Sequence, residues 1–443
     1  MLKQIFCLLL LTSNFINAQG LSMDDAVELA KANNRMLQNA GKEIKIAQQK
    51  RLETIADGLP QVSASASYLN SPDQPVSVVP SQFFGGTSGT YTSFSFGLSQ
   101  SASAGLSLEQ MIFDGSYLVG LQASKVYLQI SEQAYIKSEQ QVVGTTVESY
   151  LNTLLATAQL KVLQSNLQVA ENNYSDITQL YNNGLTEEEN VDQLSLDVAS
   201  LKSAVRYTEN LVLITKNMLQ YVLGVGYDEP LELASNLEEL TIRAQSQILG
   251  NLSIASNIDF QIAQNDIKSK ELLFKLESFK ALPRVSAFAN SGYDGFSESF
   301  DFFNSDQKWY SRTTLGLSIN FPVFTSFQGR SKKKQAKLEI EKSKKLSADL
   351  AEALKLQEKS LKNEVNYNLI NLKTTTESLA LAKSIEQKNQ IKFKEGMVST
   401  YILRQAQTQL YQAQNNYLNA MHQLVLSKAK LTLLLQPITN KNK

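Results

Sequence analysis

A group of carboxylates follows a glycine turn in the middle of the chain and is the first candidate for chemistry. The group consists of Glu187, Glu188, Glu189 and Asp192. Thr186 and Glu189 have the spacing of a capping box, in which a hydroxyl and a carboxylate bond the free backbone amides at a helix start. Acidic side chains also favour the positive end of a helix dipole. The functional alternative is an acidic collar, formed by symmetric copies of the chain and facing a partner protein or a channel entrance.

Other reactive side chains are scarce. His422 is the only histidine, and Cys7, which lies in an apolar N-terminal run, is the only cysteine. The sequence has no Cys/His cluster, no cysteine in the expected mature chain and no glycine-rich phosphate loop, so it predicts no metal centre, thiol nucleophile or nucleotide site. His422 falls beside a predicted helix seam, where we expect it to pack or to lie at the surface. We therefore expect no enzyme activity and no cofactor.

Charge and hydropathy narrow the choice of partners and of compartment. The 443 residues carry 42 basic and 42 acidic side chains, so no basic excess favours nucleic acid as a partner. Residues 1–18 have the pattern of a secretory signal peptide, with Lys3, an apolar run over 5–11 and a small residue at Ala18. No later run of 18 residues is apolar throughout. The sequence thus predicts an exported protein that does not cross a membrane by a helix.

The elements that would position these residues occur in two sequence repeats. Two motif pairs show this: LPQVSA at 59–64 with LPRVSA at 282–287, and YNNG at 181–184 with FKEG at 393–396. The two members of the first pair lie farther apart in the sequence than the two members of the second pair. This difference predicts an insertion of roughly 12 residues in the strand hairpin of the first repeat, where loops tolerate added length. We predict two repeats, 19–230 and 231–443. Each runs from a helix through two strands to a pair of helices that meet at a glycine turn, near 184 or near 396.

The helices are predicted to be long. No proline occurs from Ser81 to Glu229 or from Val323 to Gln436, and a single helix over 328–394 would span on the order of 100 Å. Uncharged residues recur at steps of three and four, at ten positions from Val191 to Val222 and at ten from Leu403 to Leu434. A repeat of about 3.5 residues predicts left-handed coiled-coil packing. Ordinary amphipathic bundle helices, with a period of about 3.6, are the alternative.

Four strands are predicted, at about 61–70, 91–113, 284–293 and 313–324. Over 93–108, Ser and Gly fill the odd positions and most even positions are apolar. A small, charge-free polar face opposite an apolar face is typical of a transmembrane strand with lipid on one side and water on the other. A small soluble sheet packed on the helices is the alternative. Aromatic residues near the hairpin ends would suit girdles at a membrane surface: Tyr68, Phe83, Phe84, Tyr91, Phe94, Phe96, Tyr293, Phe296, Phe300, Phe302, Phe303, Trp309 and Tyr310.

Four strands cannot close a barrel. Open strand edges in lipid leave backbone groups unpaired, at a cost of several kcal/mol each. If the strands cross a membrane, the chain must therefore form an oligomer. Two copies would give eight strands and three copies twelve, and the residues alone leave both arrangements open. In either case the Ser/Gly face would line a shared, water-filled pore.

At this point the chain resembles a known family. A two-repeat chain with LSMDDAVELAKANN at 21–34 after the signal, LPxVSA at the first strand of each repeat and a glycine turn before each seam helix is similar to the TolC family of outer membrane efflux proteins. The resemblance covers essentially all of the expected mature chain. It implies a mainly α fold with a small β part, a homotrimer, a twelve-stranded β-barrel in the outer membrane of a Gram-negative bacterium and a coiled-coil α-helical barrel in the periplasm.

The resemblance also implies a function and partners. The trimer would be a passive exit duct for small molecules or proteins, set in outer membrane lipid. A periplasmic adaptor protein and an inner-membrane transporter would dock on the helix-hairpin tips and supply the energy. The alternative from another class is a trimeric coiled-coil scaffold or adhesin, anchored in the outer membrane and without transport activity.

The resemblance directs attention to the two hairpin tips as sites of adaptor binding or gating. The candidates are Tyr181, Gly184, Thr186, Glu187, Glu188, Glu189 and Asp192 at the first tip, and Phe393, Gly396, Val398, Ser399, Ile402, Arg404 and Gln405 at the second. In the family's best-known member, Asp residues six and nine positions after the second turn glycine narrow the pore. Ile402 and Gln405 occupy those positions here, with Arg404 nearby, so that acidic gate does not carry over.

A basic cluster, Arg330, Lys332, Lys333 and Lys334, starts the helix that follows the last strand. It would lie close to the predicted inner edge of the membrane. A solvated helix face and contact with anionic headgroups are both open interpretations. Basic side chains at a helix start oppose the helix dipole, which indicates that a neighbouring group compensates them.

Overall fold

The computed structural model describes residues 20–247 and 250–436. The predicted signal peptide, 1–18, lies outside these residues. The first half contains α1 (Met23–Asn33), α2 (Arg35–Ala56), β1 (Gln61–Asn70), β2 (Val76–Pro80), β3 (Tyr91–Ser95), β4 (Gln100–Phe113), α3 (Gly115–Asn182) and α4 (Glu188–Leu223). The second half contains α5 (Leu237–Ser246), α6 (Ile258–Phe279), β5 (Arg284–Ser297), β6 (Trp309–Asn320), α7 (Gln328–Lys394) and α8 (Thr400–Leu435). In the described ranges, no helix combines the length and the apolar character that a membrane crossing requires.

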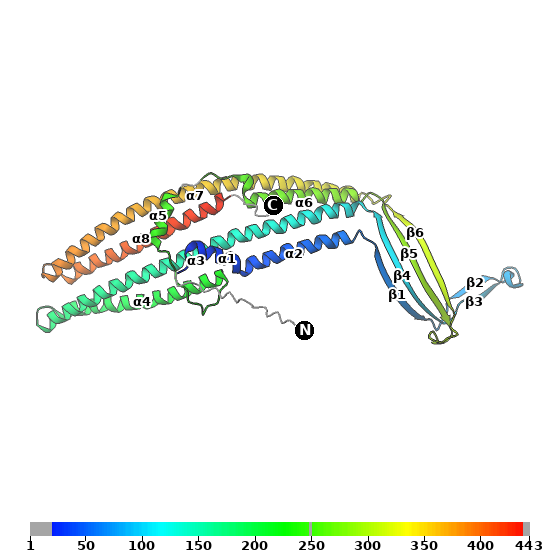
Figure 1. The fold of residues 1–443 in the computed structure, drawn as a ribbon, viewed down its shortest axis with the longest axis horizontal. Coiled ribbons are helices and arrows are strands. Elements are labelled where there is room, and N and C mark those ends of the chain that lie inside the picture. Colours follow the sequence, from blue (N-terminus) through cyan, green and yellow to red (C-terminus); the bar gives the residue numbers. More distant parts are fainter. Residues whose placement is uncertain (1–19, 248–249, 437–443) are drawn as a thin grey trace, which may run out of the picture. The chain divides into compact units, whose positions relative to one another are not determined.

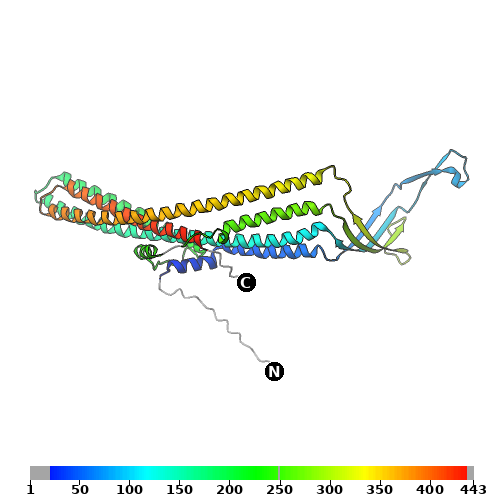
Figure 2. The same ribbon diagram turned by 90° about the horizontal axis from the view of Figure 1, so that it is seen from above.

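Two very long helices organise the chain. Helix α3 has 68 residues and α7 has 67, and the predicted single helix over 328–394 is confirmed at both ends. Each long helix turns back into a helix of 36 residues, α4 or α8. The pairs α3–α4 and α7–α8 form two helical hairpins, whose members lie side by side in both views (Figures 1 and 2).

The chain divides into two compact units. Within the described residues, the first comprises 20–44, 131–263 and 346–436, and the second comprises 45–130 and 264–345. Every boundary between them falls inside one of the helices α2, α3, α6 and α7. The first unit therefore contains the hairpin tips, and the second contains all the strands.

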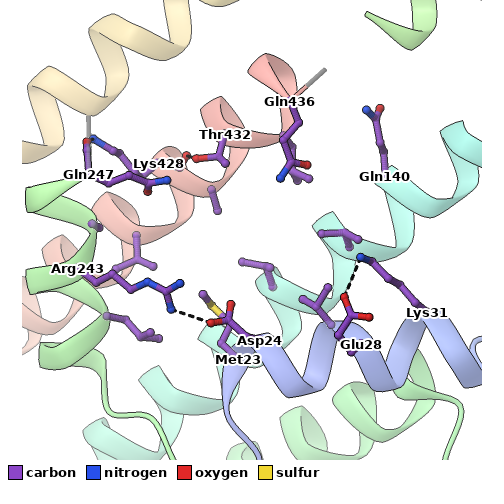
Figure 3. Close-up of a pocket in the computed structure, with 18 of the residues that line it drawn as sticks. Met23, Asp24, Glu28, Lys31, Gln140, Arg243, Gln247, Lys428, Thr432 and Gln436 are labelled. Carbon is purple, nitrogen blue, oxygen red and sulfur yellow. Dashed lines mark hydrogen bonds and ion pairs between the residues drawn. The ribbon is translucent and has the colours of Figure 1, made fainter. Parts of the chain in front are cut away.

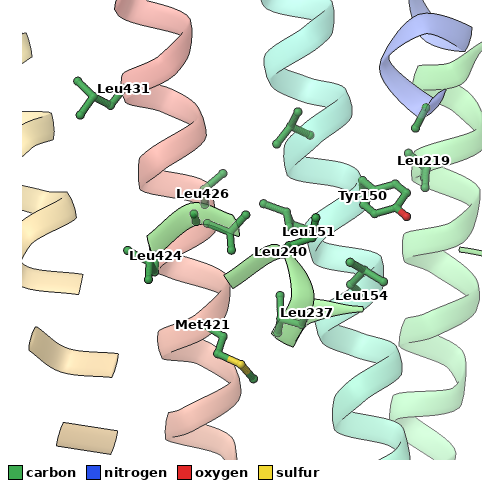
Figure 4. Close-up of a cluster of buried hydrophobic side chains, with 14 of the residues drawn as sticks. Tyr150, Leu151, Leu154, Leu219, Leu237, Leu240, Met421, Leu424, Leu426 and Leu431 are labelled. Atoms are coloured by element: carbon green, nitrogen blue, oxygen red, sulfur yellow. The ribbon is translucent and has the colours of Figure 1, made fainter. Parts of the chain in front are cut away.

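The core of the first unit lies between α1, the start of α2, α3, α4, α5, α7 and α8. Side chains of α5 insert between α8 and α3, where Leu237 and Leu240 lie between Met421 and Leu151 (Figure 4). Tyr150 is fully buried, and its hydroxyl donates to the Leu21 carbonyl at 2.7 Å. The predicted seams face inward, because none of their twenty positions is exposed. Burying a Leu side chain of this kind stabilises a fold by about 2 kcal/mol.

The second unit contains a four-stranded antiparallel sheet in the order β1-β4-β5-β6. Gly105 of β4 lies opposite Gly292 of β5. A Cβ added at Gly292 would stand 2.6 Å from the Ala104 carbonyl oxygen, so only glycine fits there. In the next strand pair, the Phe288 ring covers Gly316. Strands β1 and β6 form the two edges of the sheet, and within the described chain neither has a partner on its outer side.

The predicted strand 91–113 is wrong as one element. It is divided into β3, which pairs with β2 in a separate hairpin, and β4, which pairs with β1 and β5. Gly97 lies between them with φ of 111°, a conformation that breaks a strand. Some of the aromatic residues predicted near this hairpin end therefore belong to the separate β2–β3 hairpin. Phe84 packs against Phe94 on the β2–β3 hairpin, with 4.3 Å between ring centroids.

The strands of the second repeat also differ from the prediction. Strand β5 continues to Ser297, because β4 pairs with it along almost its whole length. Strand β6 runs from Trp309 to Asn320, not from 313 to 324. Its last pair is Asn320 with Arg284, the first residue of β5. Beyond that pair no partner strand continues, and Pro322 lacks the backbone donor that a strand ladder needs.

Candidate functional site

The two hairpin tips share one turn geometry. Gly184 has φ of 72° and Gly396 has φ of 71°, which confirms the predicted left-handed backbone. At the first tip, the Gly184 amide donates to the Tyr181 carbonyl at 2.9 Å; at the second, the Gly396 amide donates to the Phe393 carbonyl at 3.0 Å. A second bond in each tip spans one residue more on either side, as in a Schellman motif. A Cβ at either glycine would meet open space, so backbone conformation alone selects glycine here.

The predicted capping box at the first tip is wrong. Helix α4 begins at Glu188, one residue later than the box requires, and its N-cap is Glu187. Thr186 therefore lies before the cap, and its hydroxyl accepts a hydrogen bond from the Asn190 amide at 3.2 Å. Glu189 instead accepts from Gln193 at 3.1 Å. Helix α1, by contrast, has a side-chain cap, because the hydroxyl of its N-cap Ser22 accepts a hydrogen bond from the Asp25 backbone amide at 3.2 Å.

The other tip candidates lie where the sequence predicts. Tyr181, Glu187, Glu188, Glu189 and Asp192 are exposed around the first turn. At the second turn, Ser399 is the N-cap of α8, while Val398 and Phe393 are half-buried and Ile402 and Gln405 are exposed. Most of these side chains thus belong to the surface of their own hairpin. Arg404 is the candidate that the structure brings into contact with the other hairpin.

Arg404 on α8 forms a two-pronged ion pair with Asp197 on α4. Its Nε donates to Asp197 Oδ2 at 2.6 Å, and its Nη2 donates to Asp197 Oδ1 at 2.9 Å. Two parallel bonds between guanidinium and carboxylate are stronger and more directional than one. The side chains are 33% and 31% exposed, so solvent screens the pair only in part. Sequence reasoning misses Asp197; the available signal is its position next to the buried seam residue Val198 on α4.

Further polar pairs join α3 to the second hairpin. Gln390 of α7 donates to Asn173 at 2.6 Å, and Asn166 donates to Gln414 of α8 at 2.9 Å. Asn166 and Asn173 are buried and lie seven residues apart, on one face of α3. Buried polar pairs in a helix interface favour one register at some expense of stability. The two hairpins are therefore aligned by specific polar contacts in addition to apolar packing.

A titratable cluster lies next to the Arg404–Asp197 pair. Burial raises the pKa of the Glu386 carboxyl on α7, and the neighbouring Gln407 side chain partly offsets the rise. Burial raises the pKa of the Tyr411 phenol on α8 to about 12, with smaller contributions from the Glu386 and Asp197 carboxylates. The folded bundle therefore favours protonated Glu386. Its stability is expected to fall as pH rises through the raised pKa of this group.

Replacing Glu386 by Gln is expected to raise the thermal unfolding midpoint at pH 8 by on the order of 1–2 °C. At pH 4, where the carboxyl is largely protonated in both folded and unfolded chains, the midpoint should not change. Circular dichroism melts at the two pH values measure the effect. Glu377→Gln, which removes an exposed carboxylate from the same helix, is the control. An equal shift in both variants, or a shift only at pH 4, would contradict this assignment.

His422 is a packing residue. It is buried on α8, and its Nε2 donates to Asn152 Oδ1 on α3 at 3.0 Å. Burial lowers the pKa of the imidazole, with a smaller lowering effect from Lys430. Within residues 20–247 and 250–436, no three potential His, Cys, Asp or Glu ligands gather into a metal site. His422 thus bonds a neighbouring helix and has no ligand set around it.

A cavity of about 670 Å³ lies between α1, α3, α5 and α8 (Figure 3). Charged groups on its wall pair with one another. Arg243 contacts Asp24 at 2.9 Å, and Lys31 contacts Glu28 at 3.0 Å and Glu139 at 3.7 Å. Burial lowers the pKa of Lys428, whose Nζ donates to the Gln247 carbonyl at 2.6 Å. Arg243 and Lys31 are thus paired with carboxylates of the wall, and Lys428 with a backbone carbonyl.

Comparisons with known proteins agree with this architecture. A sequence profile of the outer membrane efflux protein family matches residues 26–225 and 249–435. The outer membrane protein TolC of Vibrio cholerae serotype O1 is 21% identical over 341 residues, which cover 74% of this chain and 75% of that protein. The solved structure of CusC has a TM-score of 0.75 at 17% identity and covers 96% of both chains. The CmeC outer membrane channel of Campylobacter jejuni has a TM-score of 0.72 at 16% identity, over 93% of this chain and 85% of that one.

Proposed function

Because the chain belongs to the outer membrane efflux protein family, we propose that it is the outer membrane exit duct of an export system powered by a partner. Small molecules or proteins would pass from the periplasm to the exterior without any chemical step in this chain. An inner-membrane transporter would supply the energy, and a periplasmic adaptor would connect it to the hairpin tips. We place the sheet in the outer membrane of a Gram-negative bacterium and the helices in the periplasm.

The observation that carries the proposal is a sheet with two free edges and two different faces. On β6, Leu315, Leu317 and Ile319 are exposed on one face. The opposite face carries small polar residues, such as Ser65, Gly105 and Gly292, which are aligned across β1, β4 and β5. Lipid would cover the apolar face and water the polar one. Three copies of the four-stranded sheet would close twelve strands with no edge left in lipid.

Gating is proposed at the hairpin tips. The two hairpins of each copy are held together near their tips by the Arg404–Asp197 pair. Adaptor contact around residues 181–192 and 393–405 would separate the hairpins and move the second one outward. The exposed carboxylates Glu187, Glu188 and Glu189 would form the acidic collar that meets the adaptor or the passing cargo. The repeats 19–230 and 231–443 would each contribute one hairpin to this entrance.

Deletion of the chain tests the proposal. A deletion strain should accumulate a fluorescent drug several-fold above wild type if the cargo is a small molecule, and it should lose a secreted protein if the cargo is a protein. Expression of the chain from a plasmid should restore the lost activity. If neither accumulation nor secretion changes in a strain that lacks paralogues, the exit-duct function is wrong. Protease treatment of intact cells then separates out the scaffold alternative, which predicts helices accessible from outside.

A further inference from the structure

The segment that joins β6 to α7 is exposed and apolar. Val323, Phe324 and Phe327 are 87%, 76% and 70% exposed. The rings of Phe324 and Phe327 meet edge to face, with 6.3 Å between centroids. This segment follows directly from the β6 face that carries Leu317 and Ile319, and α7 begins immediately after it (Figure 1). The apolar face of the sheet therefore continues to the helix start.

The turn holds its aromatic side chain outward in an unusual backbone conformation. Ser326 and Phe327 have φ of 47° and 64°, and they are the positive-φ residues other than glycine in the described chain. Left-handed backbone costs roughly 1 kcal/mol or more for such residues. The turn is closed by the Gln328 amide, which donates to the Thr325 carbonyl at 2.9 Å. The turn therefore keeps the Phe327 ring at the surface, beside the Phe324 ring.

Five cations follow within the first turns of α7: Arg330, Lys332, Lys333, Lys334 and Lys337. Among the described residues, none of these five has a carboxylate within ion-pair distance. The nearest acidic residues in sequence are Asp306 and Glu339, and Glu339 already contacts Lys270 and Lys342. Cations at a helix start also oppose the helix dipole. The cluster therefore needs negative charge from elsewhere.

We infer that residues 321–337 form a docking surface for anionic phospholipid in the periplasmic leaflet of the outer membrane. The inference rests on the proposed function, because it needs the apolar face of β6 to be in lipid. Phe324 and Phe327 lie at the level where aromatic rings favour the membrane interface. From Arg330 to Lys337 the helix rises about 10 Å, comparable with a headgroup layer roughly 5–8 Å thick. The cations would thus meet lipid phosphates directly beyond the aromatic rings.

A second copy of the chain is the competing source of negative charge. In the proposed trimer, β6 would pair with β1 of the next copy, which brings the end of that copy's α2 beside the start of α7. The last turns of α2 and the residue after it carry Lys50, Arg51, Glu53 and Asp57. Glu53 is already bound by Lys50 at 2.8 Å, and Arg51 balances the remaining carboxylate. This neighbour brings no net negative charge, so the observations favour lipid.

Lipid titration of the full chain tests the inference. The protein, purified in a neutral detergent, is mixed with phosphatidylglycerol or with phosphatidylethanolamine of the same acyl chains, and bound lipids are counted by native mass spectrometry. Wild type should retain phosphatidylglycerol preferentially. The combined variant Lys332→Gln, Lys333→Gln, Lys334→Gln should bind it about ten-fold or more weakly, since each cation near an anionic surface contributes substantially. The matched control Lys359→Gln, Lys373→Gln, Lys383→Gln removes three exposed cations farther along α7 and should behave as wild type.

The outcomes separate the inference from the proposed function. A triple variant that keeps the wild-type lipid preference overturns the inference, whereas conductance measured on the same preparations still reports whether the chain is a channel. If the preference persists while the triple variant loses its oligomer in lipid-free detergent, the cations bind a second copy and the inference is wrong. Failure of wild type to insert and conduct would instead defeat the exit-duct proposal.

A fluorescent reporter provides a second measurement that does not depend on the lysine variants. Trp309 is the only tryptophan, so Phe327→Trp in a Trp309→Phe background places a single indole in the turn. Phosphatidylglycerol brominated near the headgroup end of its acyl chains should quench this indole by at least half. Absence of quenching in reconstituted, conducting protein would show that the turn does not meet lipid.

Discussion

Removing the Arg404 guanidinium or the Asp197 carboxylate is expected to shift the proposed gate toward its open state by about two orders of magnitude. The pair joins α8 to α4 through two short bonds and is partly shielded from solvent, so each copy should contribute about 1 kcal/mol. If the gate opens only when all three copies separate, the contributions add to about 3 kcal/mol. Open probability in planar lipid bilayers should rise in Arg404→Ala, in Asp197→Ala and, without further gain, in the double variant.

A matched ion pair within one hairpin provides the control. Lys202 of α4 contacts Glu171 of α3 at 2.9 Å, and both helices belong to the first hairpin. Lys202→Ala removes a surface cation and an ion pair but no link between hairpins, so open probability should stay at the wild-type level. An equal increase in Lys202→Ala, or no increase in either Arg404→Ala or Asp197→Ala, would contradict a gate held by the Arg404–Asp197 pair.

Much of the helical architecture is predictable because its signals are local. The absence of proline and the glycine turns indicate one long helix close to the observed bounds of α7, and the conformations of Gly184 and Gly396 follow from their positions at helix ends. The seam positions are predictable because a repeat of uncharged residues at steps of three and four has few other uses. The family resemblance, confirmed by the profile match, adds the order in which these elements occur.

The errors arise where a non-local contact decides the local structure. Strand β6 ends at Asn320 because β5 begins at Arg284, a limit that the alternating apolar pattern through 323 does not contain. Helix α4 starts one residue after the expected cap, and Thr186 bonds Asn190 instead of capping the helix. Asp197 has no distinguishing sequence motif, since its role follows only from the approach of Arg404 on a helix about 200 residues away.

The second large effect is expected at the edge strands β1 and β6. A disulfide between these two strands should form only between different copies of the chain. In one chain, β1 and β6 are separated by β4 and β5, a distance of roughly 14 Å between edge strands. A disulfide needs Cα atoms within about 7 Å. Ser65 of β1 and Thr314 and Ser318 of β6 carry their side chains on the same small polar face. Cys7, the only native cysteine, lies in the predicted signal, so Ser65→Cys combined with Thr314→Cys or Ser318→Cys has no expected competing thiol.

Oxidation of these double-cysteine variants in membranes, followed by denaturing electrophoresis, is the most direct measurement of whether copies of the chain complete the sheet. The control pair Ser67→Cys, Ser103→Cys replaces two hydroxyls that lie 2.8 Å apart within one chain and should close without changing the band size. For at least one edge pair we expect covalent dimers and trimers, with no larger species. Bands that remain monomeric while the control pair closes, or a ladder that extends beyond three copies, would contradict a sheet closed by three chains.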